Sequence, residues 1–223
     1  GCIVSAPYTL VLTHDVDELT WRGLSPLSCG FWSLVKALGF GSLKHLLNGR
    51  LGLRDWFASV WLLLRLPLVI GSLLPDPLER SVRTVCELEQ TFGVSSTFFF
   101  IPFPNRPGRR PDGTAAPRSR ACRYRIAQHA DLIRQLHQEG WEVGLHGIDC
   151  HISPAAAQNE LAELRALLGP TVPVGCRMHW LYSTPGLYRN LRAAGYTYDA
   201  TLGSNSTVGF PEGRLRPFQD PET

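Results

Sequence analysis

Residues 153–176 read SPAAAQNELAELRALLGPTVPVGC and contain a predicted helix and strand together with the signals that bound them. Ser153 caps the helix, Pro154 occupies its first position and Gly169 ends it. Apolar residues recur at helical spacing, at positions 157, 161, 164 and 168. Residues 171–176 then supply a short strand. The run is a helix-glycine-strand unit, which is typical of α/β folds.

The same unit occurs four times along the chain. The predicted helices begin at Asp76, near Ile126, at Ser153 and at Thr184, and a glycine ends each of them. The strands that follow are predicted at residues 95–101, 141–146, 171–176 and 196–201, and a first strand at residues 8–13 precedes them. Repeated βα units build a parallel sheet, either open or closed into a barrel, with the active site at the carboxyl ends of its strands. We therefore expect a single α/β domain over residues 1–223.

The first strand is predicted to lead directly into Thr13-His14-Asp15-Val16-Asp17. Residues two apart in a strand point the same way, so Asp15 and Asp17 are expected to face the same side. Two carboxylates this close repel each other unless a positive ion separates them, which would leave one as a metal ligand and the other as a base. The alternative is that Asp17 caps a helix and Asp15 lies in a turn.

Two histidines follow the strand predicted at residues 141–146. The stretch His146-Gly147-Ile148-Asp149-Cys150-His151 offers two imidazoles and a carboxylate. An Asp/His/His set leaves room for water on a divalent metal, and that water loses a proton near neutral pH. We predict Asp17, His146 and His151 as metal ligands, with zinc expected. The alternative is that each histidine is an ordinary hydrogen-bonded loop residue.

The remaining predicted site residues follow the strand at residues 171–176. Asp15 is predicted to be the base that accepts the proton of the water, and Arg177 to pair with it and orient it. Trp180 is expected to form the floor of the pocket. An ordinary ion pair is the alternative for Arg177.

The composition is that of a globular protein, with 44% hydrophobic and 18% charged residues among 223. The formal net charge of +3 is too small to indicate a nucleic-acid partner. Six cysteines are scattered without a CxxC pair, which favours reduced thiols and a cytoplasmic location. No signal peptide is recognisable, and the first residue, Gly1, and the abrupt end at Thr223 suggest a piece of a longer chain.

Residues 19–75 differ from the rest and are predicted to be a helical, apolar insert rich in Leu, Trp and Gly. Within it, residues 56–74 are almost long enough to span a bilayer. A central Arg65 and the helix-breaking Pro67 argue against a simple span and predict two short helices. These helices are expected either to pack on the flank of the domain or to contact a membrane or a lipid tail.

Residues 102–126 form an arginine-rich loop, which contains seven arginines and one acid, Asp112. The loop follows the strand at residues 95–101 and is therefore expected on the same side of the sheet as the site. Arginine suits phosphate geometry, so one interpretation is a clamp for the pyrophosphate of a lipid carrier or for an acidic glycan. The other is a solvated, mobile loop.

Five stretches of the chain resemble, in order, the motifs of the polysaccharide deacetylase family, the NodB-homology carbohydrate esterases. They are LTHDVD at residues 12–17, STFFF at 96–100, EVGLHG at 142–147, RMHWL at 177–181 and AGYTYDATLG at 194–203. The first is similar to a bacterial branch with a THDVD motif. The site region is also similar to deformylases that act on a lipid-linked aminoarabinose.

The resemblance implies an incomplete or distorted (β/α) barrel of the NodB-homology type, with its C-terminal part beyond this sequence. It implies metal-dependent removal of an acyl group from a sugar nitrogen. Asp15 matches the family's base, Asp17 its first metal ligand and Arg177 the arginine that steadies the base. The second motif of the family supplies two histidine ligands, and a late histidine acts as general acid.

Two departures from the family affect the expected site. The family's histidines are four residues apart, whereas His146 and His151 are five apart, so Asp149 competes with His151 as third ligand. His151 is preferred because the deformylase-like sequences carry a similar His-x-x-Asp-x-His. The late histidine is expected beyond Phe218, and His179 is the nearest substitute. Asp149, His179 and Trp180 are the predicted substrate contacts.

The expected function is removal of an acetyl or formyl group from an amino sugar in a bacterial glycan or lipid-linked sugar. The alternative is a catalytically inactive domain that binds a carbohydrate or a lipid carrier, and a metal phosphoesterase could use the same ligands. The expected partners are an N-acylated sugar and, through a peripheral contact, the inner membrane surface.

Overall fold

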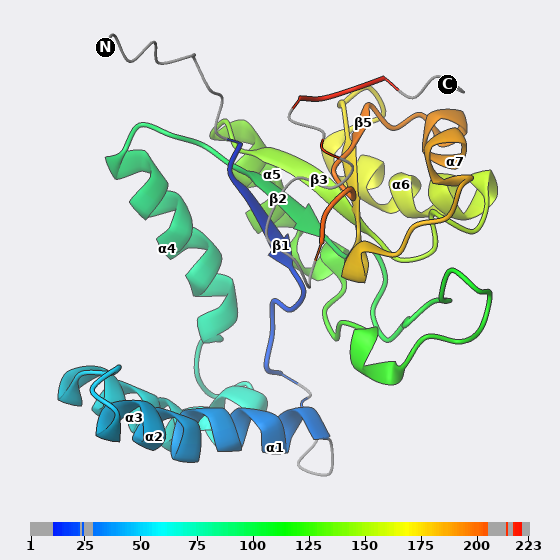
Figure 1. Cartoon of the computed structure of the whole chain (residues 1–223). Helices are drawn as coiled ribbons and strands as arrows, with labels where there is room; N and C mark the ends of the chain where they lie inside the picture. The colour runs from blue at the N-terminus through cyan, green and yellow to red at the C-terminus, as the bar shows by residue number, and fades with distance from the viewer. Residues whose placement is uncertain (1–10, 23, 25–28, 205–212, 214–215, 220–223) are drawn as a thin grey trace, which may run out of the picture. The chain divides into compact units, whose positions relative to one another are not determined.

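The computed structural model describes residues 11–22, 24, 29–204, 213 and 216–219 (Figure 1). The chain divides into two compact units. One consists of Leu19–Val85, and the other combines Gly1–Glu18 with Cys86–Thr223. The insert predicted at residues 19–75 lies within the first of these.

The second unit contains a five-stranded parallel sheet. Its strands are β1 (Thr13–Val16), β2 (Thr97–Phe100), β3 (Glu142–Gly147), β4 (Gly175–Met178) and β5 (Tyr198–Asp199). The strands lie in chain order, and among the described residues β1 and β5 form the two edges of a sheet that is not closed. The prediction of an α/β fold with a parallel sheet is confirmed.

The strand register decides which side chains share a face of the sheet. Asp15 lies opposite Phe99, Phe99 opposite Gly144, and His146 opposite Arg177. Because side chains alternate along a strand, these residues point to one face, and Phe98, Phe100 and Leu145 point to the other. The first face, with Asp15, His146 and Arg177, is termed the polar face. The second face is apolar at Phe98, Phe100 and Leu145, although His14 and Asp199 also lie on it.

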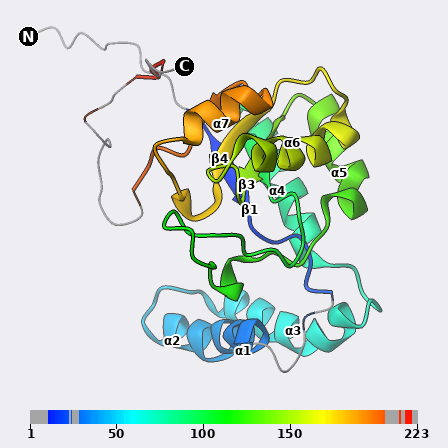
Figure 2. The same cartoon turned by 90° about the vertical axis from the view of Figure 1, so that its right-hand side faces the viewer.

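Three helices of this unit lie side by side against the sheet (Figure 2). They are α5 (Ala130–Gln138), α6 (Pro154–Leu168) and α7 (Leu187–Ala194). The predicted α6 is confirmed with its bounds, because its signals are local: the Ser153 hydroxyl accepts a hydrogen bond from the Ala156 amide at 3.2 Å, and Gly169 follows the last residue. Three short 3₁₀ turns complete the connections: η2 (Arg118–Arg120), η3 (Ile126–His129) and η4 (His179–Leu181).

All five strands differ from their predicted bounds, β2 and β3 by only one or two residues at each end. β4 begins at Gly175 and not at residue 171, since Pro170 and Pro173 have no amide hydrogen to donate to a neighbouring strand. β5 contains only Tyr198 and Asp199. β1 begins at Thr13, where its pairing with β2 begins, while residues 8–10 of the predicted first strand lie outside the described residues.

The Leu19–Val85 unit is helical. It contains α1 (Cys29–Lys36), the π-helical turn η1 (Ala37–Gly41), α2 (Ser42–Leu47), α3 (Leu53–Ile70) and most of α4 (Pro77–Thr91). Trp21, Leu66 and Val69 form its buried centre. The prediction of two short helices within residues 56–74 is wrong: Pro67 lies inside α3, close enough to its end that only the final turn follows. Among the described residues, no helix has both the length and the apolar character needed to cross a bilayer.

Candidate metal centre

Three donor atoms meet beyond the carboxyl ends of β1, β3 and β4. Asp17 Oδ1 lies 3.4 Å from His146 Nε2 and 3.3 Å from His179 Nδ1. The two imidazole nitrogens are 2.9 Å apart. Asp17, His146 and His179 therefore form a group that could hold a metal ion.

The spacing and chemistry of these donors fit a divalent cation. Two ligands that each lie 2.0–2.1 Å from a tetrahedral zinc ion are about 3.3–3.4 Å from each other. Both oxygen–nitrogen separations in the cluster have this length. The nitrogen–nitrogen separation is that of a hydrogen bond, so one imidazole can donate to the other when no cation lies between them.

The backbone of β4 fixes the tautomer of His146. His146 Nδ1 lies 2.8 Å from the carbonyl oxygen of Arg177, and a carbonyl can only accept, so Nδ1 carries the proton. The lone pair of Nε2 then points into the cluster. A backbone carbonyl commonly holds a metal-binding imidazole in this way.

The carboxylate of Asp17 forms the open side of the cluster. Its side chain is 63% exposed, whereas His146 and His179 are buried. Partial burial raises the pKa of Asp17, but the hydrogen bonds and charges of His146 and His179 outweigh it and hold the pKa well below its usual range. Asp17 is therefore an anion at neutral pH.

Asp15 lies beside the cluster and contacts Arg177, as predicted. Arg177 Nη1 donates to Asp15 Oδ1 at 3.0 Å and to the Thr13 hydroxyl at 2.8 Å. The other carboxylate oxygen, Oδ2, is 3.8 Å from His146 Nε2. Arg177 thus fixes one oxygen of Asp15 and leaves the other facing the donor cluster.

Arg177 also connects the two edges of the sheet. Its Nε donates to the carbonyl of Ala200, just after β5, at 3.1 Å, while Nη1 reaches Thr13 in β1. Its guanidinium lies 4.8 Å from the centre of the Phe99 ring. A side chain on β4 can reach both edges only if the polar face of the sheet is concave.

His179 precedes a strained turn. Trp180 and Leu181 have φ values of 59° and 55°, in the left-handed region that costs about 1–2 kcal/mol for a residue with a Cβ. The buried Arg120 donates to the carbonyl of His179 at 2.8 Å and to that of Ile148 at 3.2 Å. Arg120 therefore ties the turn after β4 to the loop after β3, and the turn directs His179 toward the cluster.

His151 is not part of the cluster, so the predicted ligand set is corrected in one member, with His179 in place of His151. His151 is buried, and its ring lies 6.2 Å from that of Tyr182. Burial and the charge of Arg120 lower its pKa. The loop turns His151 away because the buried carboxylate of Glu160 holds the Ile148 and Asp149 amides, at 2.8 Å and 2.6 Å.

Two other predicted roles also change. Asp149 accepts from Arg106 Nη2 at 2.9 Å and from the Arg109 amide at 2.8 Å, so both its oxygens are engaged, and it does not join the cluster. Trp180 does not form a pocket floor. Its side chain is 41% exposed and lies beside His179, because the left-handed turn directs it to the surface.

The arginine-rich loop is attached to the ends of the strands. Arg106 pairs with Asp149, and Arg123 pairs with Glu18 at 2.8 Å. The buried Tyr124 hydroxyl donates to the Val16 carbonyl at 2.8 Å and accepts from the Ile101 amide at 2.6 Å. These contacts hold parts of the loop at the strand ends, while residues 109–115 between them are exposed. Burial raises the pKa of Tyr124 far above its usual value, so its hydroxyl remains a donor.

The sequence-based prediction missed the supporting residues Arg120, Tyr124 and Glu160. Arg120 and Tyr124 stand in an arginine-rich stretch that reads as exposed, and Glu160 stands in a helix with other polar residues. Nothing in the local pattern separates a buried charge from a solvated one. Their roles depend on which backbone groups the fold brings next to them.

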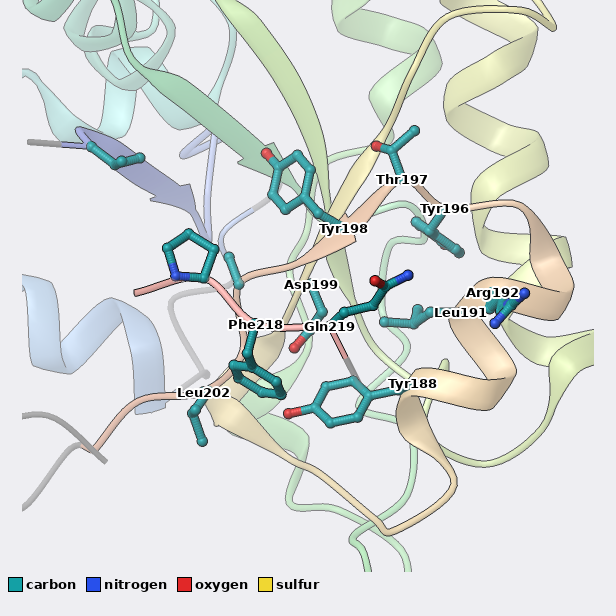
Figure 3. A pocket seen from close by; sticks show the side chains of 13 residues that line it. Tyr188, Leu191, Arg192, Tyr196, Thr197, Tyr198, Asp199, Leu202, Phe218 and Gln219 are labelled. Carbon is teal, nitrogen blue, oxygen red and sulfur yellow. The ribbon is translucent and has the colours of Figure 1, made fainter. Parts of the chain in front are cut away.

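A separate cavity of about 580 Å³ lies at the β5 edge of the sheet (Figure 3). Tyr188, Tyr198, Asp199 and Phe218 are among the residues that line it. It shares no residue with the donor cluster.

The chain was also compared with known proteins. No protein-family model, curated protein sequence or solved structure matches it.

Proposed function

We propose that this chain is a metal-dependent hydrolase that removes an N-acetyl or N-formyl group from an amino sugar. The resemblance of its five motifs to the polysaccharide deacetylases supports the substrate class, and the cluster of Asp17, His146 and His179 supports the metal dependence. Zinc fits the nitrogen and oxygen donors. The sequential strand order and the concave polar face support a partial (β/α) barrel.

The position of Asp15 is the observation that carries the proposal. A structural cation site needs only its ligands, whereas this cluster has a second carboxylate beside it, with Asp15 Oδ2 3.8 Å from His146 Nε2. Arg177 holds the other oxygen and orients the group. This is the arrangement that a general base next to a metal-bound water requires.

The roles of the residues follow from these positions. Asp17, His146 and His179 would hold the ion, which when bound supplies an activated water and polarises the acyl carbonyl. Asp15 accepts the proton of the attacking water, and Arg177 keeps Asp15 oriented. Trp180, exposed beside His179, offers an aromatic face to the sugar.

Elemental analysis of the purified chain tests the metal site. We expect about one divalent ion per chain in the wild type and its loss in Asp17→Ala, His146→Ala and His179→Ala, because each removes one of three ligands. His151→Ala and Asp149→Ala are the matched controls and keep the ion. A wild type that binds no divalent ion after reconstitution, or loss of the ion only in His151→Ala, would contradict the proposal.

Release of acetate or formate from N-acylated glucosamine oligomers tests the chemistry. Asp15→Asn keeps the ion and loses activity by about 10²–10⁴-fold, the usual contribution of a general base. Binding of the oligomer with no acid released by the wild type would instead favour the inactive carbohydrate-binding alternative.

A further inference from the structure

Helix α3 has two apolar stripes on opposite sides. The inner stripe belongs to the core of the helical unit and consists of Leu62, Leu63, Leu66, Val69 and Ile70. The outer stripe consists of Leu53, Phe57, Trp61, Leu64 and Leu68, whose exposed fractions range from 43% to 67%. The outer residues are spaced by four, four, three and four positions, which places them on one face of the helix.

The fold of the helical unit explains only the inner stripe. The outer stripe extends over four turns, or about 22 Å of helix at 1.5 Å per residue. Single exposed apolar residues are common, but a continuous row of two aromatic and three leucine side chains marks an interaction surface. Three further large apolar side chains of the same unit are also exposed: Trp32, Phe40 and Leu47.

The charges around the outer stripe are basic. Arg54 and Arg65 are eleven residues apart, so both lie along the same edge of the stripe, within about 40° of it at 100° per residue. Asp55 is the one acid between residues 29 and 74, against Lys36, Lys44, Arg50, Arg54 and Arg65. On the helical wheel Asp55 falls on the far side from the stripe.

We propose that α3 lies in the interface of an anionic lipid bilayer, with its outer stripe in the acyl boundary and its arginines at the headgroups. Trp, Phe and Leu on one face with basic residues at its edge are the pattern of helices that bind in this plane. Anionic lipid attracts juxtamembrane Lys and Arg side chains. A second copy of the chain is disfavoured as the occupant, because stacking two such units would bring like charges together.

This surface does not involve the donor cluster, so the inference stands apart from the proposed function. Vesicle sedimentation of the full chain tests it. The vesicles are phosphatidylcholine alone or phosphatidylcholine with about one third phosphatidylglycerol, a content that supplies a negative surface potential. We expect the wild type to bind the anionic vesicles and to bind neutral vesicles at least tenfold more weakly.

Two pairs of variants assign the binding to α3. Phe57→Ser with Trp61→Ser removes the aromatic part of the stripe and is expected to weaken binding at least tenfold. Its control is Phe92→Ser, an exposed aromatic in the other unit. Arg54→Glu with Arg65→Glu is expected to weaken binding to anionic vesicles only, and Arg189→Glu, also in the other unit, is its control.

The charge variants leave the apolar stripe intact, so they test the proposal even if the serine variant folds poorly. Circular dichroism establishes that each variant retains its helical content. The proposal is overturned if the wild type does not bind anionic vesicles, or if the controls lose binding as the α3 variants do. Light scattering that shows a dimer abolished by the α3 variants would assign the stripe to a second copy.

Discussion

Arg120 is a buried positive charge: only 1% of the surface of this residue is exposed. Within the described part of the chain, no carboxylate forms a direct ion pair with it. Its guanidinium donates instead to the carbonyls of Pro107, Ile148 and His179 and stacks 4.4 Å from the centre of the Tyr182 ring. Burial lowers its pKa, yet an arginine remains protonated at neutral pH. Arg120 therefore cross-links three loop segments near the donor cluster.

Arg120→Lys is expected to lower the free energy of unfolding by about 2–4 kcal/mol, because an ammonium cannot replace a planar guanidinium at three carbonyls. Chemical denaturation measures this change. Metal affinity should fall as well, since the carbonyl next to His179 loses its donor. Arg118→Lys, at an exposed position two residues earlier, is the control and should change stability by less than about 0.5 kcal/mol. Equal stability of the two variants would contradict the structural role of Arg120.

Individual site residues were predictable from the sequence where they stand in strands. Asp15, His146 and Arg177 are on paired strands, so the alternation of side chains places them on one face. That His179, and neither His151 nor Asp149, joins the cluster was not predictable. It depends on the left-handed turn at Trp180 and on Glu160 holding the loop after β3, and both are set by tertiary contacts.

Two glycines in the sheet, Gly144 and Gly175, leave room for aromatic rings of the neighbouring strands on the polar face. A Cβ at Gly144 would lie 2.5 Å from Cε1 of the Phe99 ring, and one at Gly175 would lie 2.0 Å from the Tyr198 ring. Phe99 is fully buried and supports the Arg177 guanidinium. β3 therefore has no side chain at the position opposite the Phe99 ring of β2.

Gly144→Ala is expected to destabilise the sheet by about 1–3 kcal/mol, the usual result of overpacking, and to reduce activity by displacing Phe99 beneath Arg177. Thermal unfolding measures the first effect. Gly186→Ala is the control, because its nearest contact is the flexible end of Arg189, at 3.3 Å. A wild-type melting temperature in Gly144→Ala would mean that Phe99 has room to move.

Asp199 on β5 is expected to make stability depend on pH. Burial raises its pKa from 3.8 to about 6, although hydrogen bonds from Thr201 oppose this. Because the folded carboxyl has the higher pKa, the folded state keeps a proton between about pH 4 and 6 that the unfolded chain releases, so this contribution to stability is lost as pH rises through that window.

Asp199→Asn tests this pH dependence, since an amide does not titrate. The free energy of unfolding of the variant, relative to that of the wild type, should increase from pH 4 to pH 7. Urea denaturation at each pH measures the difference. A difference that is constant over this range would show that Asp199 titrates with an ordinary pKa.

Helices with local signals and the strands β2 and β3 were predicted well, whereas the bounds of β1, β4 and β5 were not. α4 and α6 begin with a capping residue followed by proline, and both are confirmed. β1 was predicted from its apolar run, but the strand contains the polar residues Thr13 to Asp15, because pairing with β2 determines where a strand begins. The helix-breaking character of Pro67 predicts two short helices. Pro67 instead lies within α3, near its end, and the helix continues to Ile70.

A bound cation should stabilise one of the two units and not the other. All three donor residues belong to the unit that contains the sheet. An ion at 100 times its Kd stabilises the state that binds it by about 2.7 kcal/mol. Hydrogen exchange with and without zinc should show slower exchange in β1, β3 and β4 and unchanged exchange in α1–α3. Equal protection of both units would mean that they unfold together.

The position of Arg177 has a consequence for genetics. One guanidinium joins Thr13 on the first strand, Ala200 after the last strand and the carboxylate of Asp15. Under the proposed function, a substitution at this position lowers both the amount of folded protein in the cell and the turnover of each molecule that folds. A growth-based screen would therefore rank position 177 among the least tolerant of the chain, and above position 15, because Asp15 makes only one of the contacts that Arg177 joins.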